Sequence, residues 1–135
     1  MFTYVKQTVQ RALVVEDDPW MQLLITPVIK SAIPGAAVDW IGSAEEALNM
    51  VRYQKYSVIV ADINLRPNCK TGLDFWFTCR EEYPEVPILL TSSIPVDIFS
   101  QRMGLYGPHY ISKPFNMVQF KEVIKNLVFY DCLTS

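Results

Sequence analysis

The chain has 135 residues, half of them hydrophobic, and its 12 basic and 14 acidic residues leave a formal net charge of −2. This length fits one domain with a buried core, and the charge balance gives no electrostatic reason to expect direct binding to nucleic acid. Three widely spaced cysteines suggest neither a disulfide framework nor a zinc site, and no apolar run approaches the roughly 20 residues of a membrane span, so we expect a cytoplasmic protein without membrane contact.

Short apolar runs alternate with segments of helical periodicity along the chain. The run over residues 58–61 is continuously apolar, as expected for a central parallel strand that helices cover on both faces. This alternation predicts an α/β fold, a doubly wound sheet of five parallel strands with five helices on its two faces. In chain order, we expect a lead-in over residues 1–10, strands over 11–15, 36–41, 57–61, 87–91 and 109–112, and helices over 20–32, 44–54, 72–83, 95–103 and 115–130.

Capping residues and prolines set several of these boundaries. Asp18 has the position of an N-cap for the first helix, and Pro27 should kink that helix because it removes a backbone hydrogen bond. Ser43 and Glu46 have the spacing of a capping box. Trp20, which follows the first acids, is expected to pack beside them. In the last helix, the residues expected to face the core are Val118, Val123, Ile124, Leu127 and Val128.

Three carboxylates stand at the ends of two predicted strands. Glu16 and Asp17 follow the first strand, and Asp62 follows the third. If these strands are parallel neighbours, the three acids meet at one sheet edge, where they repel each other and raise their own pKa values unless a cation lies among them. Mg²⁺ is the expected cation because it takes oxygen ligands, and Mn²⁺ is an alternative. Ser92 and Lys113 fall at the same edge, where such sheets place their sites.

The chain carries, in order, the segments 14–19 (VVEDDP), 60–65 (VADINL), 72–73 (GL), 87–92 (PILLTS) and 110–115 (YISKPF). Together they resemble the receiver domain of two-component response regulators. The resemblance implies a flavodoxin-like fold with strand order 2-1-3-4-5 over residues 11–130, followed by a short tail over residues 131–135.

The resemblance also implies a function, phosphoryl transfer to Asp62 from the phosphohistidine of a sensor histidine kinase or a histidine phosphotransfer protein. Glu16, Asp17, Asp62 and the backbone carbonyl of Asn64 would bind Mg²⁺, which offsets the repulsion between the nucleophile and the phosphoryl group. Such a protein is a phosphoacceptor switch that assists its own phosphorylation and dephosphorylation, and not an enzyme.

Residues of the later strand ends would complete the switch. Lys113 would place a positive charge on a phosphoryl oxygen, and the hydroxyl of Ser92, or alternatively of Thr91, would donate to another. Tyr110 matches the aromatic position whose rotamer follows that hydroxyl, while Asp18 has at most a minor role beside its cap.

The surface formed by residues 95–103, 109–112 and 115–130 would then change and regulate a downstream protein or an output domain, and a homodimer through this surface is a further expectation. The sequence does not separate a stand-alone regulator from a receiver within a larger protein.

The chain departs from the family in one loop, and two alternative functions stay open. The loop after Asp62 is about two residues longer than is usual in the family, with Pro67 one position late and residues 68–71 as the added part, so the rim of the site should differ. A receiver-like interaction module without phosphorylation is one alternative. A phosphatase with an aspartate nucleophile is a weaker one, because that class wants two aspartates separated by one residue, whereas residues 16–18 read Glu-Asp-Asp.

Overall fold

A computed structural model describes residues 9–64, 71–104 and 107–129 of the chain. Its five parallel strands form one sheet in the order β2-β1-β3-β4-β5, as predicted. The predicted tail and most of the predicted lead-in lie outside the described residues. The strands are β1 (Arg11–Val15), β2 (Ala37–Ile41), β3 (Val58–Asp62), β4 (Ile88–Ser92) and β5 (His109–Ser112).

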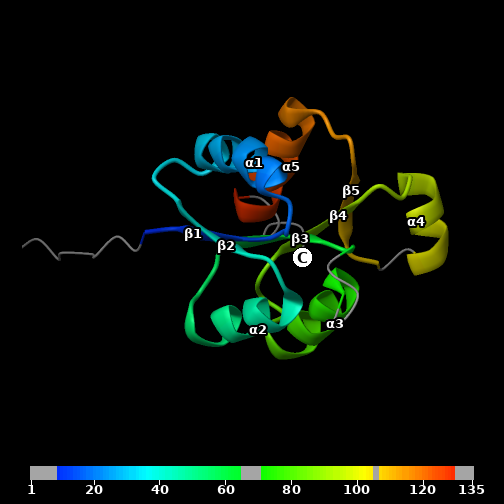
Figure 1. Ribbon diagram of the computed structural model, residues 1–135, viewed down its shortest axis with the longest axis horizontal. Helices are drawn as coiled ribbons and strands as arrows, with labels where there is room; N and C mark the ends of the chain where they lie inside the picture. Colours follow the sequence, from blue (N-terminus) through cyan, green and yellow to red (C-terminus); the bar gives the residue numbers. More distant parts are fainter. Residues whose placement is uncertain (1–8, 65–70, 105–106, 130–135) are drawn as a thin grey trace, which may run out of the picture.

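Helices cover both faces of the sheet, in the doubly wound arrangement that the sequence predicts (Figure 1). Helices α1 and α5 lie on one face, and α2 and α3 lie on the other, while α4 stands beside β4 and β5 at the end of the sheet. In the parts of the chain that are described, no helix combines the length and hydropathy that crossing a membrane requires. The helices are α1 (Pro19–Ala32), α2 (Ala44–Tyr53), α3 (Gly72–Glu82), α4 (Val96–Met103) and α5 (Met117–Phe129).

Alternation of side chains along the strands builds a separate core on each face of the sheet. On β1, Leu13 and Val15 belong to the core under α2 and α3, whereas Ala12 and Val14 belong to the core under α1 and α5. All five residues of β3 are buried, which explains why this strand is continuously apolar up to its last residue, Asp62. Each fully buried Leu, Ile or Val side chain stabilises the fold by about 1.5–3 kcal/mol.

Side-chain caps fix the beginnings of the helices. Asp18 accepts a hydrogen bond from the Trp20 N–H at 3.0 Å, as predicted for the N-cap of α1. Ser43 accepts from the Glu46 N–H at 3.3 Å. The full reciprocal capping box lies instead at the start of α3, where Thr71 and Asp74 each accept from the other's backbone N–H. The sequence interpretation had assigned Thr71 to the preceding loop.

Helix α5 corrects two predictions. It begins at Met117 and not at residue 115, because the Asn116 side chain accepts hydrogen bonds from the N–H groups of Val118 and Gln119 at 2.7 and 3.3 Å and so caps the helix. Val118 is wrong as a core residue: it is 73% exposed, and Phe120 is buried instead. Trp20, which was predicted to pack beside the acids, is 75% exposed on α1, so its ring projects into solvent and is not packed against the site.

Two strands run one residue further than predicted, and this places site residues within the sheet itself. Asp62 ends β3 and Ser92 ends β4. Backbone hydrogen bonds continue past both residues, from the Ile63 N–H to the Thr91 carbonyl at 2.9 Å and from the Lys113 N–H to the Ser92 carbonyl at 2.7 Å. The sheet therefore holds the backbone of these residues rigidly at its carboxyl edge. Helix α1 continues through Pro27.

Candidate functional site

The three acids of the sequence prediction come together at the carboxyl edge of the sheet. Strand β1 lies beside β3 in parallel, with Val15 opposite Ala61, so the residues after β1 lie next to the end of β3. Carboxylate oxygens of Glu16, Asp17 and Asp62 lie within 4.8 Å of one another. Glu16 and Asp62 are 3% and 6% exposed, so two of the three carboxylates are largely removed from water.

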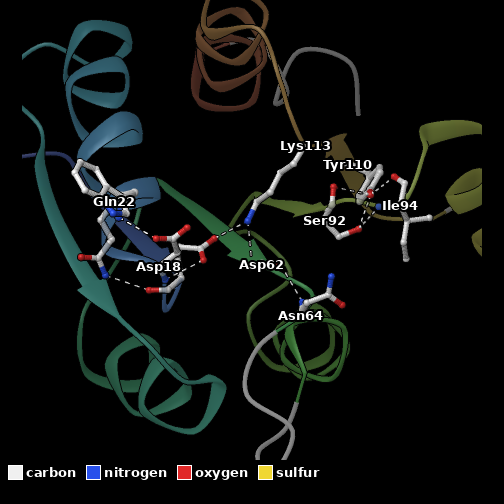
Figure 2. A network of polar contacts seen from close by, with 10 residues as sticks. Asp18, Gln22, Asp62, Asn64, Ser92, Ile94, Tyr110 and Lys113 are labelled. Carbon is white, nitrogen blue, oxygen red and sulfur yellow. Dashed lines mark hydrogen bonds and ion pairs between the residues drawn. The ribbon is translucent and has the colours of Figure 1, made fainter.

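Neighbouring groups fix Glu16 in place on both its backbone and its side chain. Its N–H donates to the Ile41 carbonyl at 2.9 Å, and its carbonyl accepts from the Gln22 side chain at 3.1 Å. One carboxylate oxygen accepts from the Asp18 N–H at 3.1 Å, and the other accepts from the Lys113 ammonium at 3.0 Å (Figure 2). Asp18 thus serves the site through its backbone, while its exposed side chain caps α1.

Asp62 is held by contacts on each of its side-chain oxygens and on its backbone. Oδ1 accepts from the Asn64 N–H at 2.9 Å, and Oδ2 accepts from the Lys113 ammonium at 3.1 Å. Behind it, the start of α3 packs so closely that a Cβ added to Gly72 would lie 2.1 Å from the Asp62 carbonyl oxygen. Only glycine permits this approach, so Gly72 sets the position of the Asp62 backbone.

Lys113 joins the two strand ends by an ion pair to each buried acid. It follows β5, and its ammonium reaches Glu16 and Asp62 from across the sheet edge (Figure 2). Burial lowers the pKa of Lys113, but its hydrogen bond to Glu16 and the charges of both carboxylates outweigh that effect, so its pKa is raised. The side chain therefore stays cationic at neutral pH.

Charge is unevenly balanced in this cluster. Burial raises the pKa of Glu16, the hydrogen bond from Lys113 opposes that rise, and the charge of Asp62 adds to it. Two buried carboxylates, those of Glu16 and Asp62, share the one positive charge of Lys113, so between these three side chains negative charge is in excess. A bound cation would relieve that excess.

The residues present fit a hard divalent cation. All three candidate ligands, Glu16, Asp17 and Asp62, offer carboxylate oxygens, the donor type that Mg²⁺ and Mn²⁺ prefer over softer metals. Asn64, whose backbone carbonyl is the fourth predicted ligand, lies two residues beyond Asp62, where its N–H is bonded to Oδ1. Its role as a ligand stays a prediction.

A second polar group gathers at the ends of β4 and β5. The Ser92 hydroxyl oxygen lies 2.6 Å from that of Tyr110 and accepts from the Ile94 N–H at 3.1 Å. The Tyr110 hydroxyl also contacts the Ile94 carbonyl. Figure 2 shows this group beside the acid cluster but separate from it. The structure thus brings together Ser92 and Tyr110, which the sequence interpretation had linked.

Thr91, the alternative hydroxyl, is placed differently. It is 1% exposed and stands opposite Asp62 in the register of β3 and β4, while its carbonyl accepts from the Ile63 N–H. Successive side chains of a strand point to opposite faces, so Thr91 and Ser92 cannot both face Tyr110. Of the long loop after Asp62, residues 65–70, which include Pro67, lie outside the described residues.

Three contributors to the site were missed by the sequence interpretation. Gln22 holds the Glu16 carbonyl from α1, and a polar residue six positions after Glu16, within two helical turns that are otherwise apolar, was a usable signal. Gly72 was noted only as part of a family segment. Phe99, which stacks on Tyr110, gave no signal, because the contact joins two elements whose approach depends on tertiary packing.

Comparisons with known proteins agree with this geometry. The model of the response regulator receiver domain family matches residues 12–125. The nitrogen assimilation regulatory protein NtrX of Azorhizobium caulinodans is 27% identical over 107 residues, which are 77% of this chain and 23% of NtrX. The chain therefore spans about a quarter of the length of that curated relative.

Solved structures show the same fold. A CheY-like response regulator receiver domain protein of Methanospirillum hungatei superposes with a TM-score of 0.77 at 20% identity, covering 95% of this chain and all of that one. The response regulator TrrA of Thermotoga maritima, solved in complex with Mg²⁺ and beryllofluoride, has a TM-score of 0.75 at 24% identity, covering 88% of this chain and 99% of TrrA.

Proposed function

The chain belongs to the response regulator receiver domain family, and from this premise we propose that it is a phosphoacceptor switch whose reacting group is Asp62. The family consists in general of phosphoacceptors and not of classical enzymes. One observation carries the proposal: Lys113 bridges Glu16 and Asp62 at the sheet edge where the three carboxylates gather.

The proposed step is a phosphoryl transfer from a phosphohistidine. An Asp62 carboxylate oxygen forms the new O–P bond while the N–P bond of the donor breaks and its imidazole leaves. A carboxylate is an adequate nucleophile because a phosphoramidate is a reactive donor. The Asn64 N–H holds Asp62 Oδ1 and the close approach of Gly72 holds the Asp62 backbone, which supports a constant direction of attack.

Charge control is the second requirement of the step. Glu16, Asp17 and Asp62, with the Asn64 carbonyl, would hold Mg²⁺ or Mn²⁺, which when bound neutralises charge on the nucleophile and the phosphoryl oxygens. Lys113 already lies 3.1 Å from Asp62 Oδ2, so a short movement of its ammonium would bring it to a phosphoryl oxygen on that atom. The Lys113 ammonium would thus pair with the Asp62 carboxylate before the transfer and with the phosphoryl group after it.

Ser92 and Tyr110 would transmit the phosphorylation of Asp62 to the protein surface. The Ser92 hydroxyl has one proton to donate, and a phosphoryl group on Asp62 offers it a charged acceptor. Its present partner is Tyr110, so a change at Ser92 reaches β5 and then α4. We propose that the surface of α4, β5 and α5 regulates a downstream protein or an output domain, and that a homodimer would use the same surface.

The donor would approach over α1. Trp20, Leu23 and Leu24 are 75%, 67% and 54% exposed at positions i, i+3 and i+4, so α1 carries an apolar stripe on its outer side. Such patches are typical of protein interaction sites, and this one starts two residues after Asp18, beside the acids. We propose that a helical, phosphohistidine-bearing partner covers it. Changing Leu23 to Asp should slow transfer from a phosphorylated donor protein but leave labelling by acetyl phosphate unchanged.

A cytoplasmic location and a place within a larger regulator are consistent parts of this proposal, since the histidine kinases that serve such domains act on the cytoplasmic side.

The proposal is tested by intact-mass analysis after incubation with acetyl phosphate and Mg²⁺. We expect the mass of one added phosphoryl group in the natural protein and none in Asp62→Asn or after chelation of the metal. A module that never accepts phosphate would show no adduct even with Mg²⁺ bound.

A further inference from the structure

The side chain of Gln22 reaches from α1 to the segment that carries Glu16 and Asp17 (Figure 2). Its amide nitrogen donates to the Glu16 carbonyl at 3.1 Å. Glu16 comes directly after the last residue of β1, and no backbone N–H within the described ranges bonds to this carbonyl. The Gln22 amide therefore takes the place that a neighbouring strand would fill if β1 continued.

The carbonyl that Gln22 holds belongs to the peptide group between Glu16 and Asp17. A peptide group is planar and includes the Cα atoms of both residues, so a hydrogen bond to its oxygen restricts the orientation of both. Glu16 and Asp17 are two of the three candidate metal ligands, whose carboxylate oxygens lie within 4.8 Å of one another. One amide group thus positions the backbone of two ligands at once.

Gln22 is itself held firmly by the start of α1. Its N–H donates to the Asp18 carbonyl at 3.1 Å, and its carbonyl accepts from the Thr26 hydroxyl at 2.7 Å. The Asp18 N–H in turn donates to the Glu16 carboxylate at 3.1 Å. These bonds tie both ends of residues 16–18 to the helix, with Asp17 between them.

Divalent cations differ in how strictly they require such positioning. Mg²⁺ demands a near-octahedral set of oxygens at about 2.0–2.1 Å, whereas Ca²⁺ accepts six to eight oxygens at about 2.3–2.6 Å in flexible arrangements. Rotation of the peptide between Glu16 and Asp17 would turn both carboxylates relative to Asp62. Mg²⁺ should therefore lose more affinity than Ca²⁺ if this peptide were released.

We infer that Gln22 is a positioning residue that fixes the peptide between Glu16 and Asp17 and thereby makes the site prefer Mg²⁺ over Ca²⁺. This inference rests on the proposed function, in which the site holds Mg²⁺. A hydrogen bond between neutral groups favours one arrangement over others by about two- to tenfold. A cation that needs this arrangement binds more weakly in proportion to the fraction of molecules that leave it.

The test compares Gln22→Met with the natural protein. Methionine has a similar length and lacks the N–H donor. Mg²⁺ and Ca²⁺ are titrated separately, and binding is followed by the NMR signals of the backbone amides of residues 16–18. In Gln22→Met, we expect the Mg²⁺ Kd to rise about two- to tenfold and the Ca²⁺ Kd by less than about twofold. Because the two ions carry the same charge, a change in electrostatic attraction alone would move both Kd values equally.

Two further variants separate positioning from other effects. Gln22→Asn keeps an amide that is one methylene too short to reach the carbonyl, so the ratio of the Ca²⁺ Kd to the Mg²⁺ Kd should fall as in Gln22→Met. Gln54→Met is the matched control, because the Gln54 amide also donates to a backbone carbonyl, that of Lys55 at 3.2 Å, but it does so at the exposed C-cap of α2. This control should leave both Kd values unchanged.

An unchanged Mg²⁺ Kd in Gln22→Met, or an equal rise of both Kd values, would overturn the inference, as would a natural protein that does not prefer Mg²⁺. The proposed function fails separately. If the natural protein binds Mg²⁺ but forms no phosphoryl adduct at Asp62, the ratio of the two Kd values in Gln22→Met still decides the inference.

Discussion

Replacing Gly72 with Ala tests how the fold positions the proposed nucleophile. The new Cβ would lie 2.1 Å from the Asp62 carbonyl oxygen and 2.8 Å from its carbonyl carbon, whereas an ordinary contact begins at 3.4 Å. The start of α3 and the end of β3 must therefore separate by about 1 Å. Both groups are backbone atoms within regular elements, so no flexible side chain can absorb the change.

The magnitude follows from two opposing effects. Alanine is favoured over glycine inside a helix by up to about 1 kcal/mol, which would stabilise the variant if there were no clash. Overpacking a rigid site costs about 1–3 kcal/mol, and a misplacement of about 1 Å in a reacting group lowers rates on the order of 100-fold. We expect the clash to dominate, with a loss of about 2 kcal/mol in the free energy of unfolding and a much slower labelling of Asp62.

Urea denaturation and the rate of adduct formation with acetyl phosphate measure the two effects. Gly42→Ala is the matched control, because its Cβ would lie 3.9 Å from the nearest atom, Asp17 Cβ, beside the same site. Acetyl phosphate should form the adduct with Gly42→Ala at the same rate as with the natural protein. If Gly72→Ala is as stable as the natural protein and labels equally fast, Gly72 does not set the position of Asp62 and the reasoning fails.

Further predictions concern the metal and the far end of the sheet. Saturating Mg²⁺, at 100 times its Kd, should raise the free energy of unfolding by about 2.7 kcal/mol, and Asp17→Asn should abolish this gain; equal gains in both proteins in thermal denaturation would exclude Asp17 as a ligand. Tyr56, 3% exposed, donates to Asp39 at 2.7 Å, so Tyr56→Phe should cost about 1–2 kcal/mol in urea denaturation at pH 7, while Tyr53→Phe, at an 83% exposed residue, should cost nothing. Burial and then the hydrogen bond to Asp39 raise the pKa of Tyr56 above its usual value of 10.0, so its contribution is complete below that pH and is lost as the pH rises further. The difference between Tyr56→Phe and the natural protein should therefore shrink above about pH 10, and a constant difference would contradict this assignment.

The sheet and its acidic edge could be predicted because local signals agree with the global fold. Continuous apolar runs mark the buried strands, and in parallel sheets the residues after such runs share one edge. Glu16, Asp17, Asp62 and Lys113 accordingly lie where the order of elements places them. Each of these residues stands at a strand end, so an error of one residue in a strand boundary does not move it away from the edge.

Details that depend on contacts between elements could not be predicted. The start of α5 is a different case, because the Asn116 side chain bonds to two N–H groups just ahead of it in the sequence, a local signal that could have been used and that the predicted start at residue 115 overlooked. Val118 has the right residue type for the core but lies on the outer side of its helix, opposite Phe120. The stack of Phe99 on Tyr110 requires α4 to stand over β5, which no periodicity in either segment reveals.

The central claim is that Asp62 itself becomes phosphorylated. Its most direct test is reductive trapping with borohydride after treatment with acetyl phosphate and Mg²⁺, because hydride converts an aspartyl phosphate into a mass-distinct homoserine that peptide sequencing by mass spectrometry can locate. The account predicts homoserine at position 62 and unmodified Glu16 and Asp17. Homoserine at position 17, or a phosphate that resists hydride and maps to Ser92, would contradict it.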